Sequence, residues 1–78
     1  MVNMKRFENL GFTVLKVDNG NFYFLEKNGV QVNVELYEDY SMTAFYPQAK
    51  RNKLVRYKNL ETFAKRFTER AVKIGASY

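Results

Sequence analysis

Cysteine and histidine are both absent from this chain of 78 residues. Without cysteine there is no disulfide framework and no thiolate nucleophile, and without histidine the commonest metal ligand and general base is missing. The four glycines fall at expected turns and helix ends and do not form a phosphate-binding loop. We therefore expect a protein that is not an enzyme and that holds neither a metal ion nor a cofactor.

Long hydrophobic runs are absent as well. The longest uninterrupted run, Phe22–Leu25, is far too short for a membrane-spanning helix or for the core of a signal peptide. We expect no membrane partner and a cytoplasmic location. The length predicts one domain, residues 1–78, near the lower size limit for folding without metals or disulfides.

The positive charge of the chain is concentrated in one segment. Outside residues 50–58, eight basic residues balance eight acidic ones, so the net charge of +5 arises within this segment, which contains no acidic residue. Its basic members are Lys50, Arg51, Lys53, Arg56 and Lys58. A polyanion or an acidic protein surface would therefore be attracted to this part of the molecule.

Helical periodicity appears at both ends of the sequence. Leu60, Phe63 and Phe67 recur at helical spacing and predict a helix over 60–74, capped by Asn59 and long enough to cover one face of a sheet. Near the start, Asn3 is expected to cap a short helix that Gly11 ends.

Between these helices the pattern is that of β-strands. Two Asn-Gly pairs, at residues 19–20 and 28–29, are the strongest local signal for hairpins with two-residue type I′ turns. Further strands are expected at 41–46 and 53–58, the latter with Val55 and Tyr57 facing inward. The predicted fold class is α+β. It comprises an antiparallel, four- to five-stranded meander sheet, packed by the long C-terminal helix, with the short N-terminal helix at its other side or edge.

Counting outward from the turns gives the register of the sheet. Two-residue turns place Val14 opposite Leu25, Leu25 opposite Val32, and Tyr23 opposite Val34, on one core face. The same count pairs Leu15 with Phe24 and Val17 with Phe22. It thus predicts a second apolar patch, on the opposite face, made of Leu15, Val17, Phe22 and Phe24.

This second patch has two interpretations. The N-terminal helix can cover it, or it can be an exposed surface that binds a partner, because large exposed apolar patches usually mark interaction sites. A homodimer through the same patch is a further arrangement that the sequence leaves open.

The basic segment also has two interpretations. With Tyr46 and Tyr57 nearby, it can bind the phosphate backbone of a nucleic acid. Alternatively, its lysines and arginines keep an edge strand soluble and unpaired. The first hypothesis is therefore a binding module for nucleic acid, and the second is an inhibitor or regulator that binds a protein partner through the apolar patch or the basic hairpin.

In size, layout and composition, with eight Asn and eight Lys, the chain resembles small accessory proteins of phages and mobile elements. That group includes anti-CRISPR and other anti-defence inhibitors, and the resemblance implies binding to a host protein that handles nucleic acid, in the host cytoplasm. The element order is also similar to that of double-stranded-RNA-binding domains. That family opens its second helix with lysines, whereas this chain has Asn59-Leu60-Glu61-Thr62.

Overall fold

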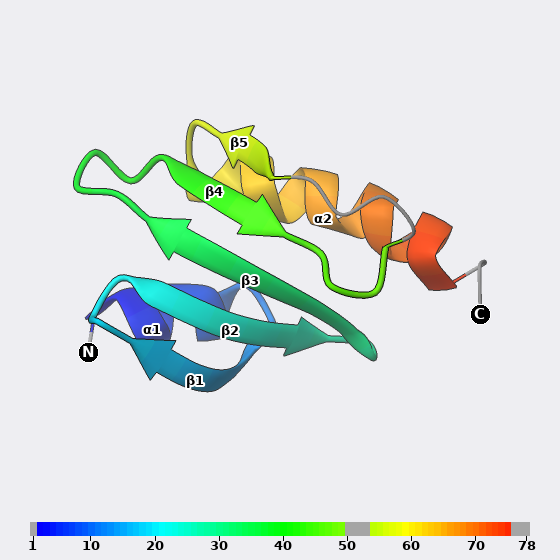
Figure 1. Cartoon of the computed structure of the whole chain (residues 1–78), viewed down its shortest axis with the longest axis horizontal. Coiled ribbons are helices and arrows are strands. Elements are labelled where there is room, and N and C mark those ends of the chain that lie inside the picture. Colours follow the sequence, from blue (N-terminus) through cyan, green and yellow to red (C-terminus); the bar gives the residue numbers. More distant parts are fainter. Residues whose placement is uncertain (1, 50–53, 76–78) are drawn as a thin grey trace.

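The structure is a computed structural model and describes residues 2–49 and 54–75. The chain forms a five-stranded antiparallel meander sheet with two helices. Neighbouring strands in the sheet are also consecutive in the chain (Figure 1). The elements are α1 (Val2–Asn9), β1 (Thr13–Asp18), β2 (Phe22–Lys27), β3 (Val30–Leu36), β4 (Met42–Phe45), β5 (Val55–Tyr57) and α2 (Leu60–Gly75). The predicted α+β meander is confirmed.

The β2–β3 turn has the predicted two-residue form. Asn28 and Gly29 have φ angles of 55° and 80°, as a type I′ turn requires, and Lys27 pairs directly with Val30. The predicted pairs of Leu25 with Val32 and of Tyr23 with Val34 follow from this turn and are confirmed.

The β1–β2 connection differs from the prediction. Asn19 and Gly20 again have positive φ angles, of 54° and 75°, but Asp18 pairs with Phe22, so the loop has three residues. The pairing next to the turn is therefore displaced by one residue. A β-bulge between Val14 and Lys16 removes the displacement, and Val14 lies opposite Leu25 as predicted.

This displacement changes which side chains face the core. Lys16, and not Leu15, lies opposite Phe24, while Val17 lies opposite Tyr23. The prediction that Val17 belongs to the second apolar patch is wrong, because the three-residue loop moves Val17 to the core face, where it packs against buried residues. Leu15 is the extra residue of the bulge and remains 54% exposed.

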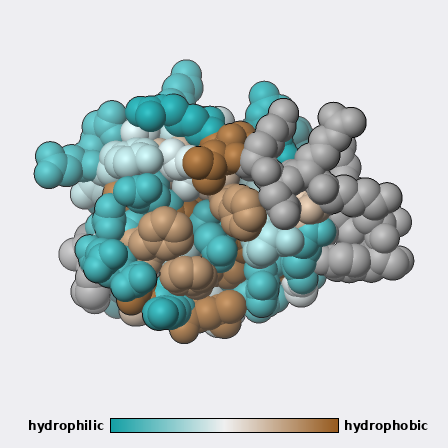
Figure 2. All heavy atoms as spheres, viewed as in Figure 1, coloured by the Kyte–Doolittle hydropathy of each residue, from teal (hydrophilic) through white to brown (hydrophobic). Residues whose placement is uncertain are grey.

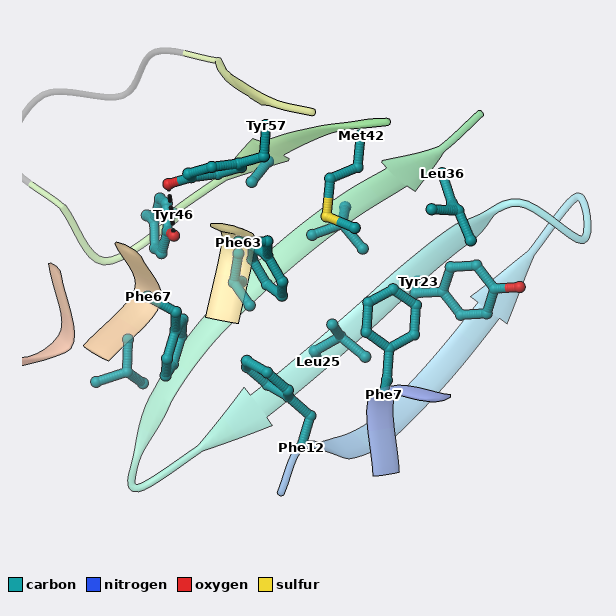
Figure 3. Packing of buried hydrophobic residues seen from close by; sticks show 14 residues of the cluster. Phe7, Phe12, Tyr23, Leu25, Leu36, Met42, Tyr46, Tyr57, Phe63 and Phe67 are labelled. Carbon is teal, nitrogen blue, oxygen red and sulfur yellow. Dashed lines mark hydrogen bonds between the residues drawn. The ribbon is translucent and has the colours of Figure 1, made fainter. Parts of the chain in front are cut away.

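Both helices lie on the same face of the sheet. The Phe7 ring of α1 has its centroid 5.0 Å from that of Tyr23 in β2 and 6.3 Å from that of Phe63 in α2 (Figure 3). Phe12 stacks on Phe63 with ring centroids 5.3 Å apart. Replacing a buried phenylalanine of this kind by alanine typically costs about 3–5 kcal/mol. One aromatic cluster therefore joins both helices to the sheet.

Of the two expected positions of α1, the other side or the edge of the sheet, the first is wrong, and the end of the helix explains why. The Phe12 N–H donates to the Phe7 carbonyl at 3.1 Å, and Gly11 adopts a φ of 91°, as in a Schellman motif. This tight turn carries the chain directly into β1 with Phe7 and Phe12 both buried in the core. The helix also begins at Val2, so Asn3 is not its cap.

The C-terminal helix begins as predicted. The Asn59 Oδ1 accepts a hydrogen bond of 2.8 Å from the Thr62 N–H, while Phe63 and Phe67 are buried against the sheet. Neither helix, over the described ranges, has the length and apolar character needed to cross a membrane. Because α1 and α2 share one face, no helix of the described residues lies on the other face of the sheet. We call it the open face.

Candidate functional site

The basic segment predicted to bind a partner is described only in its second half. Arg56 lies in the middle of β5 and Lys58 directly follows that strand, and both side chains are exposed. Lys50, Arg51 and Lys53 lie outside the described residues. Val55 and Tyr57 point toward the core, as predicted, and their packing there holds the edge strand that carries Arg56.

Contacts with the turn between β3 and β4 orient the Arg56 side chain. Its guanidinium carbon lies 5.6 Å from the centroid of the Tyr37 ring, and its Nη2 donates to Ser41 Oγ at 3.4 Å. Ser41 in turn donates to Asp39 Oδ1 through its hydroxyl and its N–H, at 2.6 and 3.0 Å. These two hydrogen bonds, with a smaller contribution from the Arg56 charge, hold the pKa of Asp39 below its ordinary value.

A groove of about 470 Å³ runs between β5 and α2. The helix presents Thr62, Arg66 and Glu69 to it at the spacing of one helical face. An adjoining hollow of about 460 Å³ adds Lys58 and Asp39 to this surface. The lining of the groove is Val55, Arg56, Tyr57, Thr62, Arg66, Glu69 and Arg70. We call Arg56, Lys58, Arg66 and Arg70 the basic edge.

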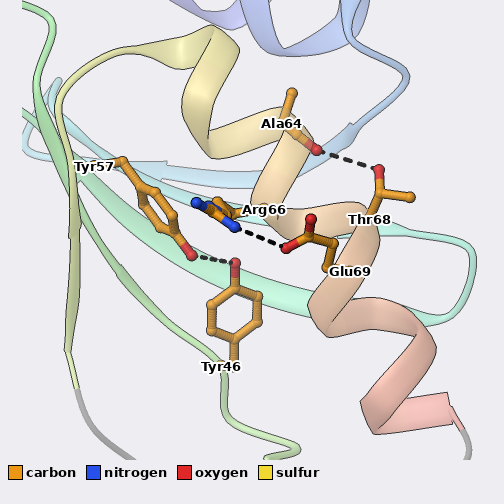
Figure 4. Close-up of polar contacts among 6 residues, drawn as sticks. All are labelled: Tyr46, Tyr57, Ala64, Arg66, Thr68 and Glu69. Carbon is orange, nitrogen blue, oxygen red and sulfur yellow. Dashed lines mark hydrogen bonds and ion pairs between the residues drawn. The ribbon is translucent and has the colours of Figure 1, made fainter.

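The helix side of the groove carries an exposed and weak ion pair. Arg66 Nη1 and Glu69 Oε2 form an ion pair of 3.1 Å, with the two side chains 59% and 54% exposed (Figure 4). An exposed pair of this type contributes only about 0–1 kcal/mol. The Arg66 guanidinium can therefore exchange its partner for an incoming anion at small cost.

Two tyrosines stand below the basic edge. The hydroxyl oxygens of Tyr46 and Tyr57 lie 3.1 Å apart in a buried hydrogen bond (Figure 4). The guanidinium carbon of Arg70 lies 5.3 Å from the centroid of the Tyr46 ring. Burial, and then the hydrogen bond with Tyr57, raise the pKa of Tyr46 far above its ordinary value, so its hydroxyl stays neutral. Tyr46 thus provides an uncharged support for Arg70.

The predicted apolar patch is found on the open face in altered form. Phe22 and Phe24 are half-buried there, with ring centroids 5.4 Å apart, and Leu15 projects from the bulge. Lys16 takes the place that the count gave to Leu15, with its Nζ 5.7 Å from the centroid of the Phe24 ring. Neither helix covers these residues, because both pack on the other side of the sheet (Figure 1).

Sequence reasoning missed Phe45 as a member of this face. Phe45 of β4 lies opposite Asn33 of β3 and is half-buried, while its neighbours Ala44 and Tyr46 point to the core. The alternation of side chains along residues 42–46 carried this signal. The hydrophobic residues of the open face form a band bordered by hydrophilic ones (Figure 2).

The carboxylates in the described part of the chain do not gather into a metal site. Across residues 2–49 and 54–75, no group of three or more metal-ligating side chains is close enough to hold an ion. Asp39 is engaged with Ser41, and Glu35 Oε1 accepts a hydrogen bond of 3.5 Å from the Tyr37 hydroxyl.

Comparisons of the chain with family models, with curated proteins and with solved structures gave no match.

Proposed function

We propose that this protein is a nucleic-acid-binding module that engages the phosphate backbone through its basic edge. The observation that carries the proposal is that β5 brings Arg56 to the same groove as Arg66 and Arg70, although the helix residues follow it by ten or more positions. Arginine lines this groove at three positions, and it is suited to phosphate because its planar guanidinium matches phosphate oxygens bidentately.

The charge balance at the basic edge also supports an anionic partner. Its four cations are accompanied by two carboxylates, those of Glu69 and Asp39, in the lining of the groove and the adjoining hollow. Asp39 is committed to Ser41, and Glu69 forms only an exposed pair with Arg66. The surface therefore keeps a net positive charge along a concave path.

The neighbouring sequence agrees in sign with this arrangement. Lys50, Arg51 and Lys53 precede β5 by a few positions and would add to its charge. The proposal rests on the four described cations. Full contact of these four with phosphates would give a salt slope of roughly −3 to −4.

Fluorescence anisotropy with labelled single- and double-stranded DNA and RNA tests the proposal. The wild-type protein is expected to bind at about 50 mM salt and to weaken steeply toward 200 mM. The double variant Lys58→Gln/Arg66→Gln is expected to lose about tenfold or more in affinity.

A matched control removes the same charge elsewhere. Lys5 and Lys65 are exposed and line neither the groove nor the adjoining hollow, so Lys5→Gln/Lys65→Gln changes the net charge equally. If both double variants weaken binding equally, the attraction is diffuse and the basic edge is not the site. If the wild-type protein binds none of the four ligands at low salt, the proposal is wrong.

A further inference from the structure

One row of side chains crosses the open face from β1 to β4. The pairing of the strands aligns Lys16 with Phe24, Phe24 with Asn33, and Asn33 with Phe45. We call these four residues the ring row. Phe24 and Phe45 stand two strands apart, so their rings are separated by about 10 Å.

Both rings of this row are partly open to solvent. Phe24 and Phe45 are half-buried, and neither helix packs on their side of the sheet. Phe22 supports Phe24 from the side, at a ring-centroid distance of 5.4 Å and an interplanar angle of 42°. The supported ring is thus held in place and still presents part of its surface to a ligand.

The charged residues differ between the ring row and the two rows beside it. The row itself contains Lys16 and no acidic residue, whereas the two rows beside it contain Asp18, Glu26 and Glu35, and one of them ends at Arg56 on β5. Glu26 Oε1 is engaged by the Gly29 N–H at 2.7 Å, and Glu35 Oε1 by the Tyr37 hydroxyl at 3.5 Å. A chain of phosphates that follows the row would meet Lys16 at one end and the β5 side of the sheet at the other.

The chemistry of the row suits bases better than phosphates alone. Exposed aromatic rings stack on the faces of unpaired bases, and the amide of Asn33 can donate to and accept from a base edge. A duplex would present only its phosphates to this row, because its bases are already stacked inside. A protein partner large enough to cover the rings would also remove the carboxylates of the two neighbouring rows from water. Burying these charges costs free energy unless the partner pairs with them.

We infer that the open face binds the unstacked bases of a single-stranded nucleic acid, with Phe24 and Phe45 as stacking platforms. This inference rests on the function proposed above and narrows its ligand to single strands. The basic edge then supplies the phosphate contacts, and the ring row supplies the contacts to the bases.

The test uses a labelled oligothymidylate of about 12 nucleotides and a duplex of the same length. The single strand is expected to bind more tightly than the duplex. Phe24→Leu/Phe45→Leu keeps apolar side chains on the sheet but removes both rings, and it is expected to weaken single-strand binding by about tenfold or more. Its salt slope is expected to remain that of the wild-type protein, because no phosphate contact is lost.

A control variant and a spectroscopic probe keep the result interpretable. Tyr40→Leu removes an aromatic ring that packs on Arg6 of α1, away from the open face, and is expected to leave affinity unchanged. Since the chain has no tryptophan, Phe45→Trp introduces a single indole on the ring row. Stacking of a base is expected to quench its fluorescence on titration with the oligothymidylate.

Three outcomes would overturn the inference. If the duplex binds as tightly as the single strand and the double leucine variant binds normally, the basic edge acts alone and the proposed function survives without the ring row. If no nucleic acid binds at all, both proposals fail. If the wild-type protein self-associates and the double leucine variant is monomeric, the open face is an interface between copies of this chain.

Discussion

Tyr46 and Tyr57 form a hydrogen bond of 3.1 Å between their hydroxyl groups, and both side chains are buried. The pair joins the residue that directly follows β4 to the last residue of β5. Tyr57 belongs to β5, and the guanidinium of Arg70 in α2 packs on the Tyr46 ring. The pair therefore connects β5 with α2 beside the groove.

Removing either hydroxyl is expected to destabilise the fold. Tyr46→Phe or Tyr57→Phe leaves the other buried hydroxyl without its partner, which costs about 1–3 kcal/mol in the free energy of unfolding. The double variant removes both polar groups, so its cost is expected to fall below the sum of the single costs. Urea unfolding of all four proteins measures this coupling. Strictly additive costs would show that the two hydroxyls do not stabilise each other.

The same pair predicts a loss of stability in alkali. Burial and the Tyr57 hydrogen bond raise the pKa of Tyr46 in the folded state, whereas the unfolded chain titrates near its ordinary value of about 10. Above that pH the unfolded state releases a proton that the folded state retains. The contribution of Tyr46 is therefore complete below about pH 10, and the free energy of unfolding then falls by up to about 1.4 kcal/mol per pH unit. Tyr46→Phe is expected to show a shallower decline in urea unfolding between about pH 8 and pH 11 than the wild-type protein.

The β-bulge of β1 predicts an unusual tolerance to deletion. Leu15 is the unpaired extra residue between Val14 and Lys16, so deleting it leaves the strand pairs on either side intact. We expect the Leu15 deletion to fold with a loss of less than about 2 kcal/mol. Deletion of Val32, within the unbroken register of β3, would turn half of that strand to the wrong face and is expected to abolish folding. Thermal unfolding and amide NMR spectra compare the two, and equal damage would contradict the bulge.

The start of α2 gives a further test of local structure. Asn59→Ala removes the 2.8 Å hydrogen bond to the Thr62 N–H and is expected to cost about 1 kcal/mol. Asn59→Asp retains an acceptor and adds a negative charge at the helix start, so it is expected to be neutral or stabilising. Chemical denaturation of both variants measures the difference. Equal destabilisation by alanine and aspartate would mean that Asn59 does not act as the cap.

Local rules explain the parts of the fold that the sequence predicted correctly. The Asn28-Gly29 turn and the Asn59 cap depend on a few adjacent residues, so their geometry follows from residue type alone. The Asn19-Gly20 pair has the same local chemistry, yet its loop has one residue more. The sheet accommodates this extra residue because the bulge at Leu15 restores the pairing further along the strand. A turn dipeptide contains no information about such a distant compensation.

The side of the sheet on which α1 lies was equally beyond local rules. A helix of two turns that carries Phe7 can cover either face, and the outcome depends on Phe7 meeting Phe63, which lies far away in sequence. The candidate site has the same dependence. Residues Arg56, Arg66 and Arg70 were each visible as cations, but their assembly around one groove results from the packing of α2 beside β5.

The salt dependence of nucleic-acid binding tests the central claim most directly. Anisotropy titrations with the oligothymidylate between about 50 and 200 mM salt give the slope of log affinity against log salt. We predict a slope of roughly −3 for the wild-type protein, reduced in magnitude by about 1.5 in Lys58→Gln/Arg66→Gln and unchanged in Phe24→Leu/Phe45→Leu. No detectable binding at the lowest salt, or the same slope in the wild-type protein and in Lys58→Gln/Arg66→Gln, would contradict the assignment of the basic edge as the phosphate-binding site.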